Sequence, residues 1–233
     1  MNLSPYTDLI DKHTGQTAFI CGAGPSFYDC YNHPDFNMIF SHVVIAVNTA
    51  YIAIEQNEEN PDRKYWVSND ALVRLWSYYN RVRKSNINKV IRSSWDRYYH
   101  EFDDPTYFFW PRPTSEDIVN PEDTGLAYCS SIPTSLDLAI KMGCSNVYLL
   151  GVDQYMLEDG KSHFWQLWDK EEQPYRIDRR IASYEEQTNA FSYNDLAYPA
   201  LKKFADSKGV KVYNCSINSN VEVFAKITPG EAF

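Results

Sequence analysis

The stretch TAFICGAGPS, residues 17–26, decides the fold, because it reads as a short buried strand that runs directly into a glycine turn. Its first half, AFIC, is an apolar run of strand length bounded by turn-forming residues. Gly22 and Gly24 can adopt backbone angles closed to other residues, and they leave room for a ligand near the main chain. Pro25 and Ser26 suit the first turn of a helix, where free N–H groups attract anions. The segment GAGPS, named here the glycine turn, is therefore either a phosphate-binding loop or a plain tight turn.

Length and composition are those of an ordinary soluble globular protein. The chain has 233 residues, of which 44% are hydrophobic and 23% charged, and this length is enough for one large α/β domain or two small ones. The net charge of -9 argues against binding to nucleic acid or to an anionic membrane surface. The first residues, MNLSPYTDLIDKH, lack the basic start and apolar core of a signal peptide, and no apolar run has the length of a transmembrane segment. These features predict a cytoplasmic protein.

The five cysteines indicate reduced thiols. They are odd in number, widely spaced and without a CxxC pair, which disfavours both a disulfide framework and a zinc site. We expect buried, free side chains at Cys21, Cys30, Cys129, Cys144 and Cys215.

Segments typical of strands alternate with segments typical of helices along the whole chain. Such alternation predicts βαβ units and a mostly parallel sheet with helices on both faces. We expect strands at residues 18–21, 42–48, 64–69, 89–93, 106–110, 146–150 and 210–214, and helices at residues 6–12, 71–84, 130–143 and 183–208, with a bend at Pro199 and a short helix in the tail. Residues 154–182 are polar, charged and aromatic, which is typical of a lid over a site. The sequence therefore predicts one Rossmann-like α/β domain over residues 1–233, with a lid-like insertion around residues 154–182.

Polar residues follow the predicted strands at the sheet edge where such folds bind ligands. Asn48, Asp70 and Asp153 each come after a strand, and Asn214 and Ser216 come after the last one. Asp70 and Asp153 could hold Mg²⁺ between them and a diphosphate, because Mg²⁺ prefers carboxylate oxygens among protein ligands. The alternative is that both aspartates cap helices or form turns.

Two further groups of side chains could serve chemistry at this edge. His163 lies within DGKSHFW in the predicted lid, where an imidazole with a pKa near neutrality can act as general acid or base. The alternative for His163 is an ordinary surface histidine. Ser130 and Ser131 open a predicted helix, and their hydroxyl and N–H groups suit either a phosphate or a helix cap.

The sequence does not match the motifs of several well-known sites. GAGPSF departs from the dinucleotide pattern GxGxxG, because Phe27 stands at the third glycine position, and Asn48 rather than an acidic residue closes the second strand. Both departures argue against an NAD-dependent dehydrogenase. The sequence also lacks the P-loop pattern and the nucleophile elbow of serine hydrolases.

The order of these motifs resembles two groups of enzymes. ICGAGPS, AVNTA, PDRKYWVSND and the block SSIPTSLDLAIKMGCSNVYLLGVDQYM with KSHF are similar to the 6-hydroxymethylpterin pyrophosphokinase-like family. The same layout resembles the bacterial sialyltransferases of glycosyltransferase family 42, and VYNCSINSNVEVF is similar to the stretch that closes their nucleotide site. The resemblance covers roughly residues 17–225 and implies a Rossmann-like, nucleotide-dependent transferase.

The resemblance also implies roles for individual residues. His163 would correspond to the lid histidine, the presumed base of the sialyltransferases, and Asp153 to a carboxylate near the ribose or a metal. These two are the expected catalytic residues. Cys129 stands where the family usually has glycine, and the lid here is rich in tryptophan. The expected nucleotide-binding residues are Gly22, Gly24, Pro25, Ser26, Asn48, Asp70, Ser130, Ser131, Asn214 and Ser216.

We therefore expect a nucleotide-dependent transferase, foremost a glycosyltransferase with a CMP-type nucleotide-sugar donor and a small molecule or glycan as acceptor. The glycine turn would hold the donor phosphate, and His163 would deprotonate the acceptor hydroxyl or protonate the leaving phosphate. One alternative is a diphosphokinase that uses ATP and Mg²⁺, with Asp70 and Asp153 as metal ligands. The other is a nucleotide-binding module without activity.

Overall fold

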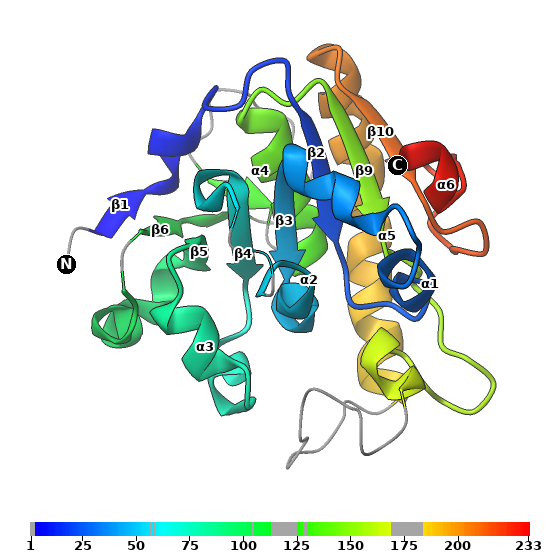
Figure 1. Ribbon diagram of the computed structural model, residues 1–233, viewed down its shortest axis with the longest axis horizontal. Coiled ribbons are helices and arrows are strands. Elements are labelled where there is room, and N and C mark those ends of the chain that lie inside the picture. The colour runs from blue at the N-terminus through cyan, green and yellow to red at the C-terminus, as the bar shows by residue number, and fades with distance from the viewer. Residues whose placement is uncertain are drawn as a thin grey trace.

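Nine parallel strands form one sheet in the computed structural model, which describes residues 3–55, 57, 59–103, 105–112, 125–127, 130–168 and 184–233 (Figure 1). In chain order the strands are β1 (Leu3–Pro5), β2 (Thr17–Cys21), β3 (Val43–Val47), β4 (Lys64–Ser68), β5 (Asn88–Arg92), β6 (Thr106–Phe109), β9 (Asn146–Leu150), β10 (Lys211–Asn214) and β11 (Ala225–Lys226). Across the sheet their order is β1-β6-β5-β4-β3-β2-β9-β10-β11. A separate parallel pair joins β7 (Pro111–Arg112) to β8 (Leu126–Ala127). The predicted Rossmann-like α/β fold is confirmed.

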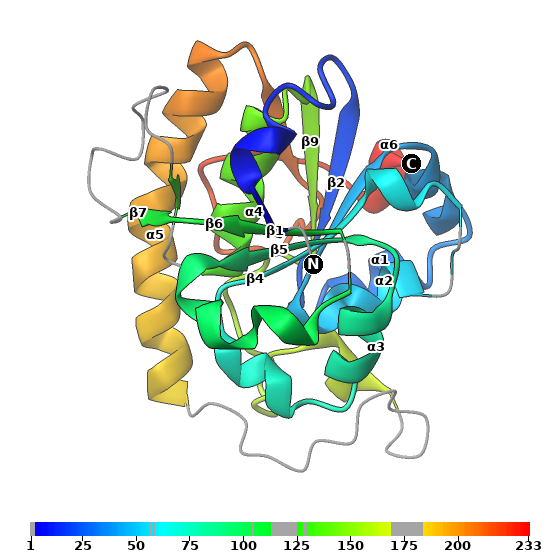
Figure 2. The ribbon, with the colours of Figure 1, turned by 90° about the vertical axis from the view of Figure 1, so that its left-hand side faces the viewer.

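Helices cover both faces of this sheet (Figure 2). The α-helices are α1 (Phe27–Tyr31), α2 (Ile52–Glu55), α3 (Tyr79–Lys84), α4 (Ser131–Lys141), α5 (Tyr184–Ser207) and α6 (Pro229–Ala232). The 3₁₀ turns are Tyr6–Leu9, Phe36–Ser41, Asn48–Tyr51, Pro61–Arg63, Ala71–Leu75, Ser93–Glu101 and Phe164–Leu167. Helices α4 and α5 lie on one face, and α1, α2 and α3 lie on the other (Figure 2).

The alternation of side chains along each strand builds two cores. Ala18 and Ile20 of β2 join the cluster under α4 and α5, whereas Phe19 and Cys21 join the cluster under α1, α2 and α3. Every residue of β3 and β4 is buried, which explains why these strands read as nearly continuous apolar runs in the sequence. The described cysteines, Cys21, Cys30, Cys144 and Cys215, are buried and free, as the sequence predicts.

The strand order reverses at β2, and this reversal positions the site. The chain leaves β2 through α1 and returns as β3 on one side, while β9 pairs with β2 on the other. In open parallel sheets, ligands bind beyond the carboxyl ends of the strands at such a reversal. Here the glycine turn leaves β2, and residues 151–153 leave β9.

The predicted helix over residues 71–84 is wrong as one element. The chain forms a 3₁₀ turn, Ala71–Leu75, extends at Trp76 with φ -94° and ψ 147°, and forms the short helix α3 afterwards. Leu72 and Leu75, which the periodicity places in the core, are 63% and 41% exposed. The break lets Trp76 pack edge-on against Trp165, with ring centroids 6.0 Å apart. This long-range contact overrides the local helical pattern.

Other differences are smaller. The predicted helix at residues 6–12 is a four-residue 3₁₀ turn, and β1, β7, β8 and β11 were not predicted. Helix α5 continues through Pro199, and α6 supplies the predicted short helix in the tail. Within the described part of the predicted lid, residues 154–168, one 3₁₀ turn forms and no strand; residues 169–182 lie outside the described residues. That the whole chain is one domain with an insertion stays a prediction.

Across the described ranges, no helix combines the length and the apolar character needed to cross a membrane.

Candidate functional site

The glycine turn lies directly against the loop that follows β9. The Gly22 N–H donates to the Leu150 carbonyl (2.7 Å), and the Gly24 N–H donates to the Gly151 carbonyl (2.9 Å). A Cβ on Gly22 would lie 2.5 Å from the Gly151 oxygen, and one on Gly24 would lie 2.5 Å from Oδ2 of Asp153. Because no real Cβ tolerates such distances, both glycines are required by the close approach of the two loops.

Asp153 joins the ends of three strands. Its carboxylate is 2% exposed and accepts from the Ser26 N–H (2.7 Å), from the Ser26 hydroxyl and from the Ser216 hydroxyl (2.5 Å). Burial raises the pKa of Asp153, and the serine hydrogen bonds oppose that rise. The side chain therefore connects the turn after β2 and the segment after β10 to the end of β9.

These contacts bear on the phosphate-loop hypothesis. The N–H groups of Gly22, Gly24, Ser26 and Phe27 all donate to protein acceptors, and the acceptor for Ser26 is the Asp153 carboxylate. Helix α1 has only five residues, so its dipole is small. The carboxyl group of Asp153 already occupies the position where a phosphate was expected. In this conformation the geometry supports a tight structural turn more than a phosphate cradle.

His163 lies beside the glycine turn. The Phe164 N–H donates to the Ala23 carbonyl (3.1 Å), which attaches the histidine segment to the turn. Nδ1 of His163 is 2.8 Å from the Ser162 hydroxyl, and the imidazole stacks on Trp165 at 5.6 Å between centroids. Burial lowers the pKa of His163 to about 4, so the ring is neutral at pH 7. When Nδ1 donates to Ser162, Nε2 is the basic nitrogen.

A cavity of about 130 Å³ links the turn, Asp153 and His163. Gly24, Asp153 and His163 all line it, together with Gln154 and Asn194. A larger cavity of about 690 Å³ adjoins it and shares Gln154 as a wall. The structure thus brings a neutral imidazole, a buried carboxylate and two amide side chains to the reversal point of the sheet.

Asp70 and Asp153 do not form a shared metal site. Strands β3 and β2 separate β4 from β9, which puts the two strand ends about 14 Å apart at ~4.8 Å per strand. Oδ1 of Asp70 accepts from the Leu72 N–H (2.8 Å), which is the capping role that the alternative gave it. Among the described residues, no three His, Cys, Asp or Glu side chains cluster as metal ligands.

Ser130 and Ser131 belong to the neighbouring strand end. Ser130 precedes α4 without a side-chain capping bond, and the Ser131 hydroxyl accepts from the Asn69 N–H (3.0 Å). The Asn69 amide also donates to the Thr134 hydroxyl (2.8 Å). These bonds fasten the start of α4 to the end of β4. Neither serine lines the cavity beside His163.

Asn48 and Asn214 follow their strands as predicted. Asn48 has a left-handed backbone (φ 48°), its carbonyl accepts from Trp66 Nε1 (3.1 Å), and its buried Oδ1 has no partner among the described residues. Asn214 donates to the Val152 carbonyl (3.1 Å) and accepts from the Ser216 N–H (3.2 Å), so it braces β10 against β9.

Sequence reasoning missed Ser162, Gln154 and Asn194. Ser162 and Gln154 lie in the predicted lid, where no spacing distinguishes them from surface residues. Asn194 had a signal, because it occurs on α5 at helical spacing between Phe191 and the buried Tyr198. A polar residue within an otherwise apolar helix face points to a site.

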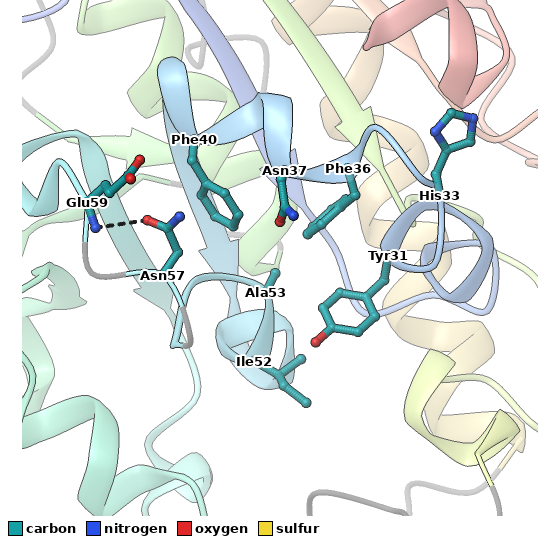
Figure 3. A pocket seen from close by; sticks show the side chains of 9 residues that line it. All are labelled: Tyr31, His33, Phe36, Asn37, Phe40, Ile52, Ala53, Asn57 and Glu59. Atoms are coloured by element: carbon teal, nitrogen blue, oxygen red, sulfur yellow. Dashed lines mark hydrogen bonds between the residues drawn. The ribbon is translucent and has the colours of Figure 1, made fainter.

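Side chains of α1, of α2 and of the 3₁₀ turn Phe36–Ser41 line a separate cavity of about 580 Å³ (Figure 3). The rings of Tyr31, Phe36 and Phe40 line it, and Oδ1 of Asn57 accepts from the Glu59 N–H (3.0 Å) (Figure 3). None of the residues predicted for the site lines this cavity, so it is not the candidate site.

No protein-family model matches the chain, and no curated protein matches its sequence. The structure of the MAf glycosyltransferase from Magnetospirillum magneticum AMB-1 matches 99% of this chain at 18% identity, with a TM-score of 0.62. The chain spans 39% of that protein's length. The sialyltransferase CstII from Campylobacter jejuni, solved with cytidine-5'-monophosphate, matches 93% of this chain and 86% of its own at 12% identity, with a TM-score of 0.47.

The MAf likeness shows that the chain has the Rossmann-like fold found in a glycosyltransferase. This is the fold that the sequence resemblance implies. The resemblance to the pyrophosphokinase-like family gains no support from these comparisons.

Proposed function

We propose that the protein is a glycosyltransferase that moves a sugar from a nucleotide-sugar donor to a hydroxyl group of an acceptor. The observation that carries the proposal is the position of His163. Its neutral imidazole lines the cavity at the reversal point of the sheet, and the Phe164–Ala23 hydrogen bond fastens it to the glycine turn. The fold, shared with a glycosyltransferase, supports the same reaction class.

In this mechanism His163 is the general base. It takes the proton from the acceptor hydroxyl while the acceptor oxygen bonds to the anomeric carbon and the bond from that carbon to the donor phosphate breaks. A pKa of about 4 keeps the ring unprotonated at pH 7 but makes it a weak base. The negative phosphate of a bound donor would raise this pKa, because a nearby opposite charge favours the imidazolium.

The remaining residues act by binding and bracing. Asp153 holds the turn through Ser26 and Ser216, so we place the ribose hydroxyls rather than the phosphate beside its carboxylate, since two anions there would repel. The unpartnered Oδ1 of Asn48, on the neighbouring strand end, suits the amino group of a base. The proposal assigns no Mg²⁺ ligands, because Asp70 and Asp153 lie at separate strand ends.

Titration calorimetry tests the donor class. CMP is the first nucleotide to test, because the sequence motifs resemble those of family 42 sialyltransferases. We expect CMP to bind in the presence of EDTA. Binding of ATP alone, and only with Mg²⁺, would instead indicate the diphosphokinase.

A second measurement separates an enzyme from a silent binding module. His163→Ala should slow transfer and donor hydrolysis by about 10²–10⁴-fold while CMP affinity remains. An unsubstituted protein that binds CMP but neither hydrolyses nor transfers from CMP-sugars would overturn the catalytic part of the proposal.

A further inference from the structure

Two adjoining cavities run along α5 beside His163. The larger, about 690 Å³, lies between α5 and the described part of the lid and has Asp195 in its wall. The smaller, about 130 Å³, reaches His163 and Gly24. Both are bordered by Gln154 and Phe191, so the larger cavity leads to the imidazole. Their combined size is that of a site for a small organic ligand.

Two buried amide oxygens in these walls have no hydrogen-bond donor among the residues that the structure describes. Asn194 is 6% exposed, and its Oδ1 has no partner among the described residues. Oε1 of Gln154 is likewise buried without a partner, although Nε2 of Gln154 donates to Oδ1 of Asp195 (2.5 Å). A buried acceptor without a donor is destabilising and uncommon in folded proteins. Two such acceptors in one cavity indicate that a ligand supplies the donors.

The backbone at Gln154 supports the same interpretation. Gln154 has φ 52°, a conformation that non-glycine residues rarely adopt. The Asn220 side chain holds this conformation by donating to the Gln154 carbonyl (3.0 Å). Strained residues held by their surroundings cluster at binding sites.

The charge of the cavity walls restricts the class of ligand that can bind. Glu158 and Asp195 line the larger cavity, and no Lys or Arg is found among the described lining residues of either cavity. Carboxylates in the wall repel anions and favour neutral or cationic ligands. The unpartnered acceptors call for hydroxyl or ammonium donors.

We infer that these cavities form the acceptor subsite, and that Asn194 and Gln154 accept hydrogen bonds from a neutral or amino-bearing sugar without a carboxylate. This inference rests on the proposed glycosyltransferase function for its link to His163. It names Asn194 as a binding residue that determines acceptor specificity.

Saturation-transfer NMR with three probes tests the ligand class, with and without CMP. The probes are methyl β-D-galactopyranoside, glucosamine and glucuronate. We expect the first two to bind and glucuronate not to bind. Binding of glucuronate alone, or of no probe in either condition, would overturn the inference.

Asn194→Leu tests the binding residue. Leucine has nearly the same size and removes the unpartnered oxygen, so the ligand-free protein should melt at an equal or higher temperature. Binding of methyl β-D-galactopyranoside should weaken by about tenfold, the loss of one hydrogen bond. A lower melting temperature with unchanged probe binding would show that Asn194 is purely structural.

Asp195→Asn tests the charge of the wall of the larger cavity, with Asp206→Asn as its matched control on the same helix. Asp206 is exposed and pairs with Lys202. Asp195→Asn should weaken the binding of glucosamine relative to methyl β-D-galactopyranoside, and Asp206→Asn should change neither. Equal effects of both substitutions would refute a local role for Asp195.

Failure of this inference is distinguishable from failure of the proposed function. Probe binding without any nucleotide binding would refute the transferase and leave a sugar-binding cavity. Metal-independent CMP binding without any probe binding would leave the transferase and refute the acceptor subsite.

Discussion

Ser216→Ala should destabilise the fold by removing one of the three hydrogen bonds to the buried Asp153 carboxylate. Ser216 and Asp153 are each 2% exposed, and the bond is 2.5 Å long. No described group other than Ser26 donates to this carboxylate in place of Ser216. A hydrogen bond to a charged group contributes about 1.5–3 kcal/mol. In a chain of 233 residues this corresponds to a fall in Tm of roughly 3–12 °C.

The stability that Ser216→Ala removes should grow as the pH rises. Burial raises the pKa of Asp153, so the folded state holds the proton more tightly than the unfolded chain does. The stabilisation from this group is therefore present below the unfolded pKa and is lost as the pH rises through the folded pKa. Ser216→Ala removes a donor that favours the ionised form and raises the pKa of Asp153 further. Below the pKa, only a neutral hydrogen bond of about 1 kcal/mol is lost.

Urea unfolding near pH 7 and at mildly acidic pH measures both effects, because the midpoint shifts while the slope stays constant. A double-mutant cycle with Asp153→Asn isolates the Ser216–Asp153 interaction. Ser41→Ala is the control: Ser41 is exposed, its hydroxyl donates to the Met38 carbonyl, and the substitution should change stability by less than about 0.5 kcal/mol. If Ser216→Ala costs no more than the control at either pH, the carboxylate does not hold the three strand ends together.

Three other outcomes follow from the same geometry. Gly24→Ala should destabilise the fold by about 1–3 kcal/mol in urea unfolding, because its Cβ would lie 2.5 Å from Oδ2 of Asp153; an unchanged midpoint would mean that the two loops separate easily. His163→Ala should slow sugar transfer by about 10²–10⁴-fold in a donor-turnover assay, and an unchanged rate would remove His163 from the mechanism. Burial lowers the pKa of His13 to about 4 from 6.5, so the unfolded chain takes up a proton first as the pH falls. Stability should therefore fall by up to about 1.4 kcal/mol per pH unit between pH 6.5 and about 4, and His13→Gln should flatten that slope in urea titrations.

The strands of the sheet centre were predictable because their signal is local. A strand buried on both faces must be apolar at nearly every position, as VVIAV in β3 is. Strand β1, with three residues, and β11, with two, carry no such pattern and exist only through pairing with β6 and β10. The break in the helix at Trp76 could not be predicted from the local sequence either, because its packing partner Trp165 lies far along the chain.

The candidate site, too, was predictable from the sequence only in part. Gly22, Gly24, Asp153 and Asn214 were identifiable because the carboxyl ends of parallel strands meet at one edge. The sequence did not show that Asp70 and Asp153 lie at separate ends, since that depends on the order of strands across the sheet.

The sequence by itself determined that TAFICGAGPS is a buried strand followed by a turn at the ligand edge of a parallel sheet. Only the tertiary structure decided what that turn does. Ser26 and Asp153 are 127 positions apart, yet the carboxylate accepts the N–H that was expected to bind a phosphate. It also decided that Asn194, from α5, lines the cavity and that its Oδ1 has no partner within the described part of the chain. Apolar periodicity is a local property of the chain, whereas the donor that satisfies a buried polar group is chosen by the folding of distant segments.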